Sequence, residues 1–133
     1  MFLVDGYRSL KVYEKSFDLV AEIYQYVKTL PKEETFGLSS QMRRAAYSVP
    51  LNIAEGYGRR PSLKEYRQFL LIARGSANEM VVLVDLCEAL QYMPAQQAID
   101  YRERYIEAAK MLSGIIAKVS GIRDQESGET PLD

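Results

Sequence analysis

The stretch LKEYRQFLLIARGSANEMVVLVDLCEALQY, residues 63–92, decides the fold, because its apolar side chains recur at every third or fourth position from end to end. That spacing aligns them along one side of an α-helix. Ser62 precedes the stretch and Glu65 lies three positions further on, the arrangement of a capping box that begins a helix. We therefore expect one long helix here, of the kind that occupies the centre of a helix bundle. Its apolar side consists of Leu63, Tyr66, Leu70, Ala73, Ala77, Met80, Val84 and Cys87.

The rest of the chain shows the same helical periodicity in three further segments. We expect helices over about residues 8–30, 38–57, 63–92 and 95–121. Pro31 ends the first of them, and Pro50 is predicted to kink the second because its nitrogen carries no hydrogen for the helix ladder. Gly121 is the expected end of the last helix, and the polar residues 123–133 are predicted to form a disordered tail.

The predicted fold class is all-α. The connections between the predicted helices are short, and short connections favour antiparallel neighbours, so we expect an up-down-up-down four-helix bundle. A chain of 133 residues is long enough for one such domain, which we place over residues 1–122.

The first and third predicted helices carry more apolar surface than the core of one bundle needs. In the first helix, a second apolar line with Leu19 and Ile23 lies beside the main one; in the third, Leu83 and Leu86 belong to such a second line. This excess predicts a subunit interface. The main apolar line of the first helix consists of Leu10, Tyr13, Phe17, Val20, Tyr24 and Val27.

Composition excludes several classes of function. The chain has no histidine, which removes His-assisted nucleophiles and the Glu-x-x-His ligand pairs of di-iron bundles. Cys87 is the single cysteine, so it forms no intramolecular disulfide and no cysteine zinc site. No apolar run is long enough to span a membrane, and the opening residues 1–5 do not resemble a secretory signal. We expect a cytoplasmic protein that is not an enzyme and holds no cofactor and no metal.

Positive charge is concentrated in the middle of the chain. Between Ser40 and Gly75 there are seven cations and two carboxylates, a local charge of +5 that leaves −6 for the remainder. Arg60, Arg67 and Arg74 are spaced seven residues apart, which suits contact with nucleic-acid phosphates. The alternative is a solvated face or salt bridges to the acidic first and fourth helices. The seven candidates are Arg43, Arg44, Arg59, Arg60, Lys64, Arg67 and Arg74.

Polar residues also occur at helical spacing on the inner sides of the second and third helices. Ser48, Asn52 and Glu55 share one edge of the second helix, and Ser76 and Glu79 lie close together on the third. Two carboxylates on facing helices are able to hold a metal or perform acid–base chemistry. The favoured interpretation is a structural polar network with arginine counterions that fixes the register of the helices.

These residues resemble a known family: the four-helix-bundle proteins first noticed as open reading frames in intervening sequences of bacterial 23S rRNA genes. The resemblance extends from about Tyr7 to Gly121. It implies four antiparallel helices assembled into a homopentameric ring. The motifs that carry it are Gly37-Leu38, Gln41-Met42-Arg43-Arg44-Ala45-Ala46, Ser48, Asn52-Ile53-Ala54-Glu55-Gly56 and Ala73-Arg74-Gly75-Ser76 with Glu79.

The same resemblance extends to a related branch, the accessory variability determinant proteins of diversity-generating retroelements. Those proteins are similar pentamers that bind nucleic acid and a reverse transcriptase through a basic surface. For the wider family the biochemical role is largely unassigned. We expect a homo-oligomeric scaffold or accessory protein that binds RNA or DNA through the second and third helices. The alternative is a carboxylate-based metal-binding or enzymatic bundle that uses Glu55 and Glu79.

Overall fold

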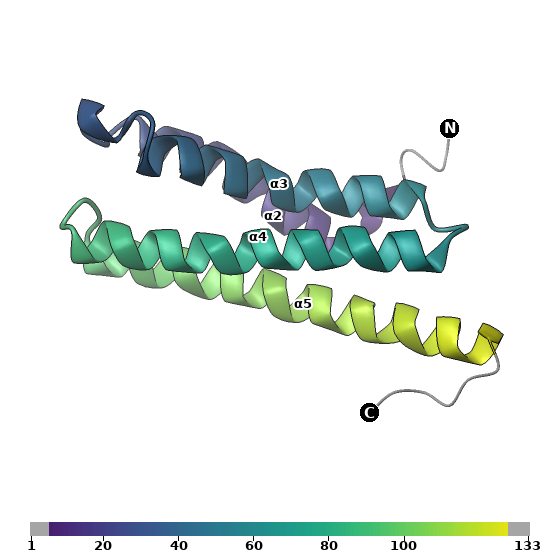
Figure 1. The fold of residues 1–133 in the computed structure, drawn as a ribbon. Coiled ribbons are helices and arrows are strands. Elements are labelled where there is room, and N and C mark those ends of the chain that lie inside the picture. The colour runs from purple at the N-terminus through teal and green to yellow at the C-terminus, as the bar shows by residue number, and fades with distance from the viewer. Residues whose placement is uncertain (1–5, 128–133) are drawn as a thin grey trace.

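The computed structural model describes the backbone of residues 6–127 and the side chains up to residue 121, and over this range the chain consists of helices joined by turns, with no strand (Figure 1). The predicted all-α class and the four helices are confirmed. The elements are the 3₁₀ turns η1 (Tyr7–Ser9) and η2 (Lys32–Glu34) and the helices α2 (Lys11–Val27), α3 (Leu38–Gly58), α4 (Leu63–Ala89) and α5 (Ala95–Ser127).

Successive helices run in opposite directions and pack as neighbours (Figure 1). α4 packs along α3 on one side and along α5 on the other, whereas α2 packs along α3 and meets α5 over a shorter seam. α2 and α4 consequently lie diagonally across the bundle. This arrangement leaves the outer side of each helix free to carry a surface feature of its own.

The core takes a different side of α2 from the one that the periodicity emphasises. Leu19 and Ile23, on the second apolar line of the sequence, are fully buried. Phe17 and Tyr24, on the main line, are 56% and 37% exposed. α2 has core neighbours on one side only, so a helix with two apolar lines leaves one of them outside. The prediction that this helix has surplus apolar surface therefore holds. Leu19 and Ile23 of the second line enter the core, and Val27 is the buried member of the main line.

The ends of α4 follow local chemistry. The Ser62 hydroxyl accepts the Glu65 N–H at 3.3 Å, which is the first half of the predicted capping box. At the other end α4 ends at Ala89, earlier than predicted. Gln91 adopts a left-handed φ of 63°, and the Tyr92 N–H bonds back to the Cys87 carbonyl at 2.8 Å. This is a Schellman closure formed without glycine.

α5 continues past its predicted end. Gly121 keeps a helical conformation, and the helix reaches Ser127, so residues 123–127 are helical where the sequence predicts a disordered tail. Glycine ends a helix when it takes the left-handed conformation, and within a helix it only lowers stability. The remainder of the predicted tail, residues 128–133, lies outside the described residues. Among residues 6–127, no helix combines the length and the apolarity that a bilayer crossing requires.

Candidate functional site

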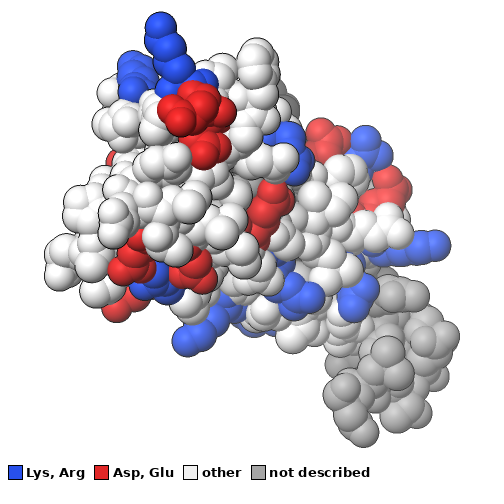
Figure 2. Space-filling model, turned by 60° about the vertical axis from the view of Figure 1, so that its left-hand side comes forward, with Lys and Arg blue, Asp and Glu red and all other residues white. Residues whose placement is uncertain are grey.

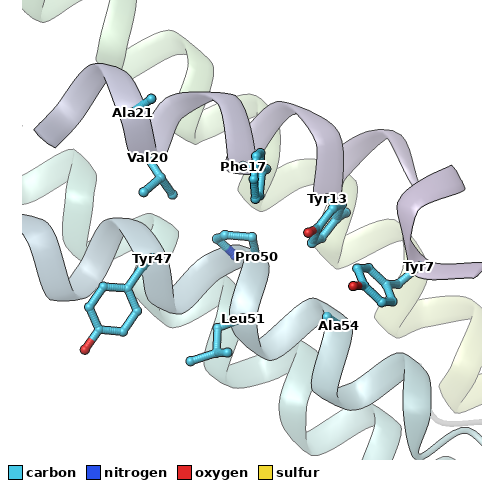
Figure 3. A pocket seen from close by; sticks show the side chains of 9 residues that line it. All are labelled: Tyr7, Tyr13, Phe17, Val20, Ala21, Tyr47, Pro50, Leu51 and Ala54. Atoms are coloured by element: carbon cyan, nitrogen blue, oxygen red, sulfur yellow. The ribbon is translucent and has the colours of Figure 1, made fainter. Parts of the chain in front are cut away.

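The outer sides of α2 and α3 form an apolar groove, which we call the α2–α3 groove (Figure 3). It has a volume of about 430 Å³, and tyrosine hydroxyls are the ionisable groups of its lining. Tyr13, Phe17 and Val20 of α2 point towards α3, from which the Pro50 ring faces them. The lining consists of Tyr7, Tyr13, Phe17, Val20, Ala21, Tyr47, Pro50, Leu51 and Ala54. The groove offers contact area rather than catalytic groups.

Aromatic contacts order the α2 wall of this groove. The Tyr13 ring meets the Tyr7 ring edge-on at 4.7 Å and lies 5.7 Å from the Phe17 ring, between ring centroids. Burial is the main cause that raises the pKa of Tyr13, so its hydroxyl stays neutral near pH 7. Phe17 and Leu51 are nevertheless 56% and 58% exposed. This wall therefore combines rings in contact with one another and apolar side chains that remain open to water.

A second exposed apolar surface follows the outer side of α4, diagonally across the bundle from α2. We call it the α4 stripe, and its members are Ile72, Val82, Leu86 and Leu90. Gly75 continues the same side of the helix and has open space where a Cβ would lie. The stripe is a convex ridge on a single helix, whereas the α2–α3 groove is concave. The two surfaces lie on different faces of one chain.

Several of the predicted nucleic-acid-binding cations are engaged within the chain. Arg44 pairs with Glu79 at 3.5 Å. Arg59 donates to both Glu55 and Glu65 at 2.9 Å, and these two hydrogen bonds raise the pKa of Arg59. These contacts match the predicted alternative of salt bridges, although the partners come from α3 and α4 themselves rather than from the first and fourth helices.

Arg60 lies in the turn before α4 and not on the helix. Its Nε–H donates to the Tyr57 carbonyl at 3.0 Å, and its guanidinium lies 3.6 Å from the centroid of the Tyr57 ring. The seven-residue spacing from Arg60 to Arg67 and Arg74 therefore does not form one line on α4. Spacing alone misses this because α4 begins only at Leu63.

Arg67 and Arg74 instead lean over α5 and follow a shallow furrow, which we call the α4–α5 furrow. Arg67 donates to the Ser120 hydroxyl at 2.8 Å, and Arg74 donates to the Ser113 hydroxyl at 3.2 Å. The part beside Arg74 has a volume of about 500 Å³ and a lining without a carboxylate: Arg74, Asn78, Ile106, Ala109, Lys110 and Ser113. In Figure 2, Lys and Arg side chains follow the lower edge of the view, and Asp and Glu side chains lie among them towards the left.

The sequence-based candidates omit Lys110 and Asn78 from this furrow. Both lie outside the sets selected by segment charge, and only the packing of α4 on α5 brings them beside Arg74. Of the two remaining candidates, Lys64 is exposed near the start of α4. Arg43 lies on a different seam, at the junction of α2 and α3. The seven cations therefore form no single basic face.

The structure brings together three of the five residues of the predicted polar network. The Ser48 and Ser76 hydroxyls are 2.7 Å apart in the interface between α3 and α4. The Asn52 amide donates to the Ser48 hydroxyl at 3.0 Å and to the Ser48 carbonyl at 2.8 Å. This cluster sets the register in which α3 and α4 face each other, because both hydroxyls need a partner in a buried place.

Glu55 and Glu79 lie outside that cluster and apart from each other. Each pairs with its own arginine, Glu79 with Arg44 and Glu55 with Arg59. Arg44 and Glu55 are separated by three turns of α3, roughly 16 Å along the axis. Among the described residues no three carboxylate or thiol side chains gather as metal ligands. The alternative of a shared carboxylate site therefore receives no geometric support.

Cys87 belongs to the core of the bundle. It is fully buried, and its thiol lies 3.6 Å from the Met42 sulfur. Burial raises its pKa, which keeps the thiol protonated and poorly nucleophilic. The residue therefore acts as a small apolar side chain, as the sequence predicts.

Together these features define a small four-helix bundle with an apolar groove, an apolar stripe and a cationic furrow on its outside. Residues 8–114 match the family described as 23S rRNA-intervening sequence protein, and the chain belongs to that family. The match confirms the family expected from the sequence motifs. A comparison with curated proteins gave no match.

Proposed function

We propose that the protein is a self-assembling accessory protein without catalytic activity, in which the α2–α3 groove of one copy receives the α4 stripe of the next. The exposed apolar groove is the observation that carries this proposal. Phe17 and Leu51 are more than half exposed on a lining that is otherwise apolar. Burial of such side chains contributes roughly 25 cal/mol per Å² of apolar surface, so a second copy that covers them gains stability.

The shapes favour a head-to-tail assembly. A groove and a ridge on different faces do not pair with themselves, so each copy offers one of each to two different neighbours. Heterologous contacts of this kind close into a ring when the rotation between copies is suitable. The family resemblance sets the proposed number of copies at five.

The furrow on α4 and α5 supports a role in nucleic-acid binding. Arg67, Arg74 and Lys110 follow it without a carboxylate in its described lining near Arg74. In a ring the same furrow recurs on every copy, which multiplies a modest local charge. We infer that RNA or DNA binds there through its phosphates, and we place the protein in the cytoplasm.

Light scattering on the purified protein tests the assembly. We expect a mass of several chains at micromolar concentration, and a monomer would contradict the proposal. Binding to a structured RNA tests the second part: affinity should fall steeply as salt rises, since each phosphate contact releases a counterion. Arg67→Glu with Arg74→Glu should abolish this binding, whereas Arg59→Glu, at an arginine already paired with Glu55, should weaken it less. Equal losses of RNA affinity in the two variants would mean that RNA binds outside the α4–α5 furrow.

A further inference from the structure

A second pocket lies where α2 passes into α3, and neither the self-association nor the furrow accounts for it. We call it the turn pocket. Lys28 and Lys32 line it from the end of α2 and the following turn, and Arg43 lines it from the second turn of α3. Its volume is about 380 Å³, within the range of sites for small molecules.

The turn pocket carries positive charge that no carboxylate of its lining neutralises. Its lining contains these three cations and no carboxylate. Lys28, Lys32 and Arg43 form no ion pair with the described residues, unlike Arg44 one position further along the chain. Three positive charges around one concavity repel each other, so an anion that enters it is stabilised by all three.

Neither of the two carboxylates of the adjacent turn, Glu33 and Glu34, lines the pocket. Glu34 accepts hydrogen bonds from the Tyr92 hydroxyl at 3.2 Å and from the Leu38 N–H at 3.3 Å. Burial is the main cause that raises the pKa of Tyr92, and the hydrogen bond to Glu34 adds to that rise. The two carboxylates do not neutralise the pocket from within its lining.

The floor of the pocket adds a hydrogen-bond donor. Ser39 is only 5% exposed, lines the pocket and makes no side-chain hydrogen bond to a described residue. It lies in the first turn of α3, where the Glu34 carboxylate already accepts the Leu38 N–H at 3.3 Å. The Ser39 hydroxyl is therefore the donor that this turn offers to a ligand in the pocket.

Another part of the lining is apolar. Its members are Tyr24, Val27, Leu30 and Pro31, and Thr35 also lines the pocket. Tyr24 is 37% exposed, so its ring is accessible to a ligand. A ligand that fits both parts of the lining carries a compact anion on one end and an apolar or aromatic body on the other.

We propose that the turn pocket binds a phosphorylated small molecule, with the phosphate held by Lys28, Lys32 and Arg43 and the organic part against Tyr24 and Leu30. Phosphate suits this site because its several oxygens accept hydrogen bonds from more than one cation at once. The same group also occurs in a nucleic-acid backbone, so the test separates the two sources.

Calorimetric titration with phenyl phosphate tests the proposal on the full chain. We expect saturable binding at millimolar concentration or below, weaker binding of inorganic phosphate, and none of phenol, since phenol lacks the anion. The double variant Lys32→Gln with Arg43→Gln should weaken phenyl phosphate binding by about tenfold or more, because it removes two charge-assisted contacts. Both side chains reach solvent, and a thermal melt checks that the variant stays folded.

The matched control is Lys11→Gln with Lys64→Gln, which removes the same charge from exposed positions outside the turn pocket and the α4–α5 furrow. We expect it to leave phenyl phosphate binding unchanged. Equal weakening in both double variants would show general attraction to a cationic protein and would overturn the site. Absence of saturable binding to the wild type would also overturn it. If a single-stranded oligonucleotide binds through Lys32 and Arg43 while phenyl phosphate does not bind, the small-molecule assignment is wrong.

Discussion

The two sides of α2 differ in how they meet water. Towards α5 two ion pairs bridge the seam: Arg104 donates to Glu22 at 2.8 Å, and Lys15 pairs with Glu107 at 3.3 Å. Towards α3 the outer side is the α2–α3 groove, where rings and aliphatic side chains lie open. On its α5 side, α2 thus contributes to two ion pairs within the chain. On its α3 side, the apolar side chains of the groove remain open to water.

This difference indicates which side of α2 needs a partner. Ion pairs such as Arg104–Glu22 remain hydrated and need nothing further. Exposed rings such as Phe17 remain unfavourable in water until another surface covers them. The contrast supports the groove, and not the seam, as the place where another molecule binds.

The largest expected effect is on assembly. Leu51→Asp places a charge in the groove and should reduce the mass in solution to that of a monomer, since burying an unpaired carboxylate in an interface is strongly unfavourable. Ile99→Asp is the matched control, because Ile99 is an exposed apolar residue of α5 outside both the groove and the stripe. Light scattering compares the two. An unchanged mass for Leu51→Asp, or an equal loss for Ile99→Asp, would remove the distinction between the two sides.

The next effect concerns the α3 wall of the groove, which rests on the close approach of α3 to α4 at Gly56. A Cβ there would lie 2.8 Å from the Phe69 Cβ and 3.3 Å from the Tyr66 carbonyl oxygen. Gly56→Ala should therefore lower the free energy of unfolding by about 1–3 kcal/mol through overpacking. Gly114→Ala, at an open helical position, should raise it by about 1 kcal/mol. Urea unfolding measures both, and effects of the same sign would contradict this account.

A smaller effect tests the core behind the charged seam. The Tyr105 hydroxyl is buried without a hydrogen-bond partner among the described residues, and burial raises its pKa. Tyr105→Phe removes that hydroxyl and should stabilise the protein by about 1 kcal/mol, because an unpaired buried polar group is costly. Thermal or urea unfolding provides the measurement. A loss of stability would mean that the hydroxyl has a partner, such as a bound water.

The smallest effect is the pH dependence of the seam. The hydrogen bond from Arg104 is the main cause that holds the pKa of Glu22 below its ordinary value of 4.5. A lowered pKa in the folded state gives stability that is present above the ordinary pKa and is lost as the pH falls through the lowered one. Glu22→Gln removes this carboxylate, so the variant should lose less stability than the wild type as the pH falls. The difference should be less than about 1 kcal/mol, because the pair is exposed. Glu103→Gln is the control, and identical acid profiles for both variants would contradict the assignment.

Much of the fold follows from the sequence because helix periodicity is a local signal. The Ser62 cap and the breaks between helices are also local signals, so the sequence predicts them as well. The sequence does not predict the end of α4, because its left-handed residue is Gln91 and glycine is the usual marker of that conformation. The extension of α5 past Gly121 was missed for the opposite reason, since glycine there stays helical.

The functional surfaces were less predictable, because they depend on which helices meet. Charge along the chain grouped Arg59 and Arg60 with Arg67, yet Arg59 pairs with Glu55 and Arg60 stacks on Tyr57. The α4–α5 furrow exists because α5 packs on α4, and no single segment of the sequence reveals that packing. Likewise, the periodicity of α2 identified two apolar lines, and only the tertiary structure decided which of them remains outside.

Mixing two variants tests the central claim most directly. Leu51→Asp impairs the groove, and Val82→Asp impairs the α4 stripe. In a head-to-tail assembly each variant alone is a monomer, whereas an equimolar mixture joins one intact groove to one intact stripe and gives a dimer by light scattering. A mixture that stays monomeric, or a Val82→Asp protein that assembles like the wild type, would contradict the pairing of groove and stripe.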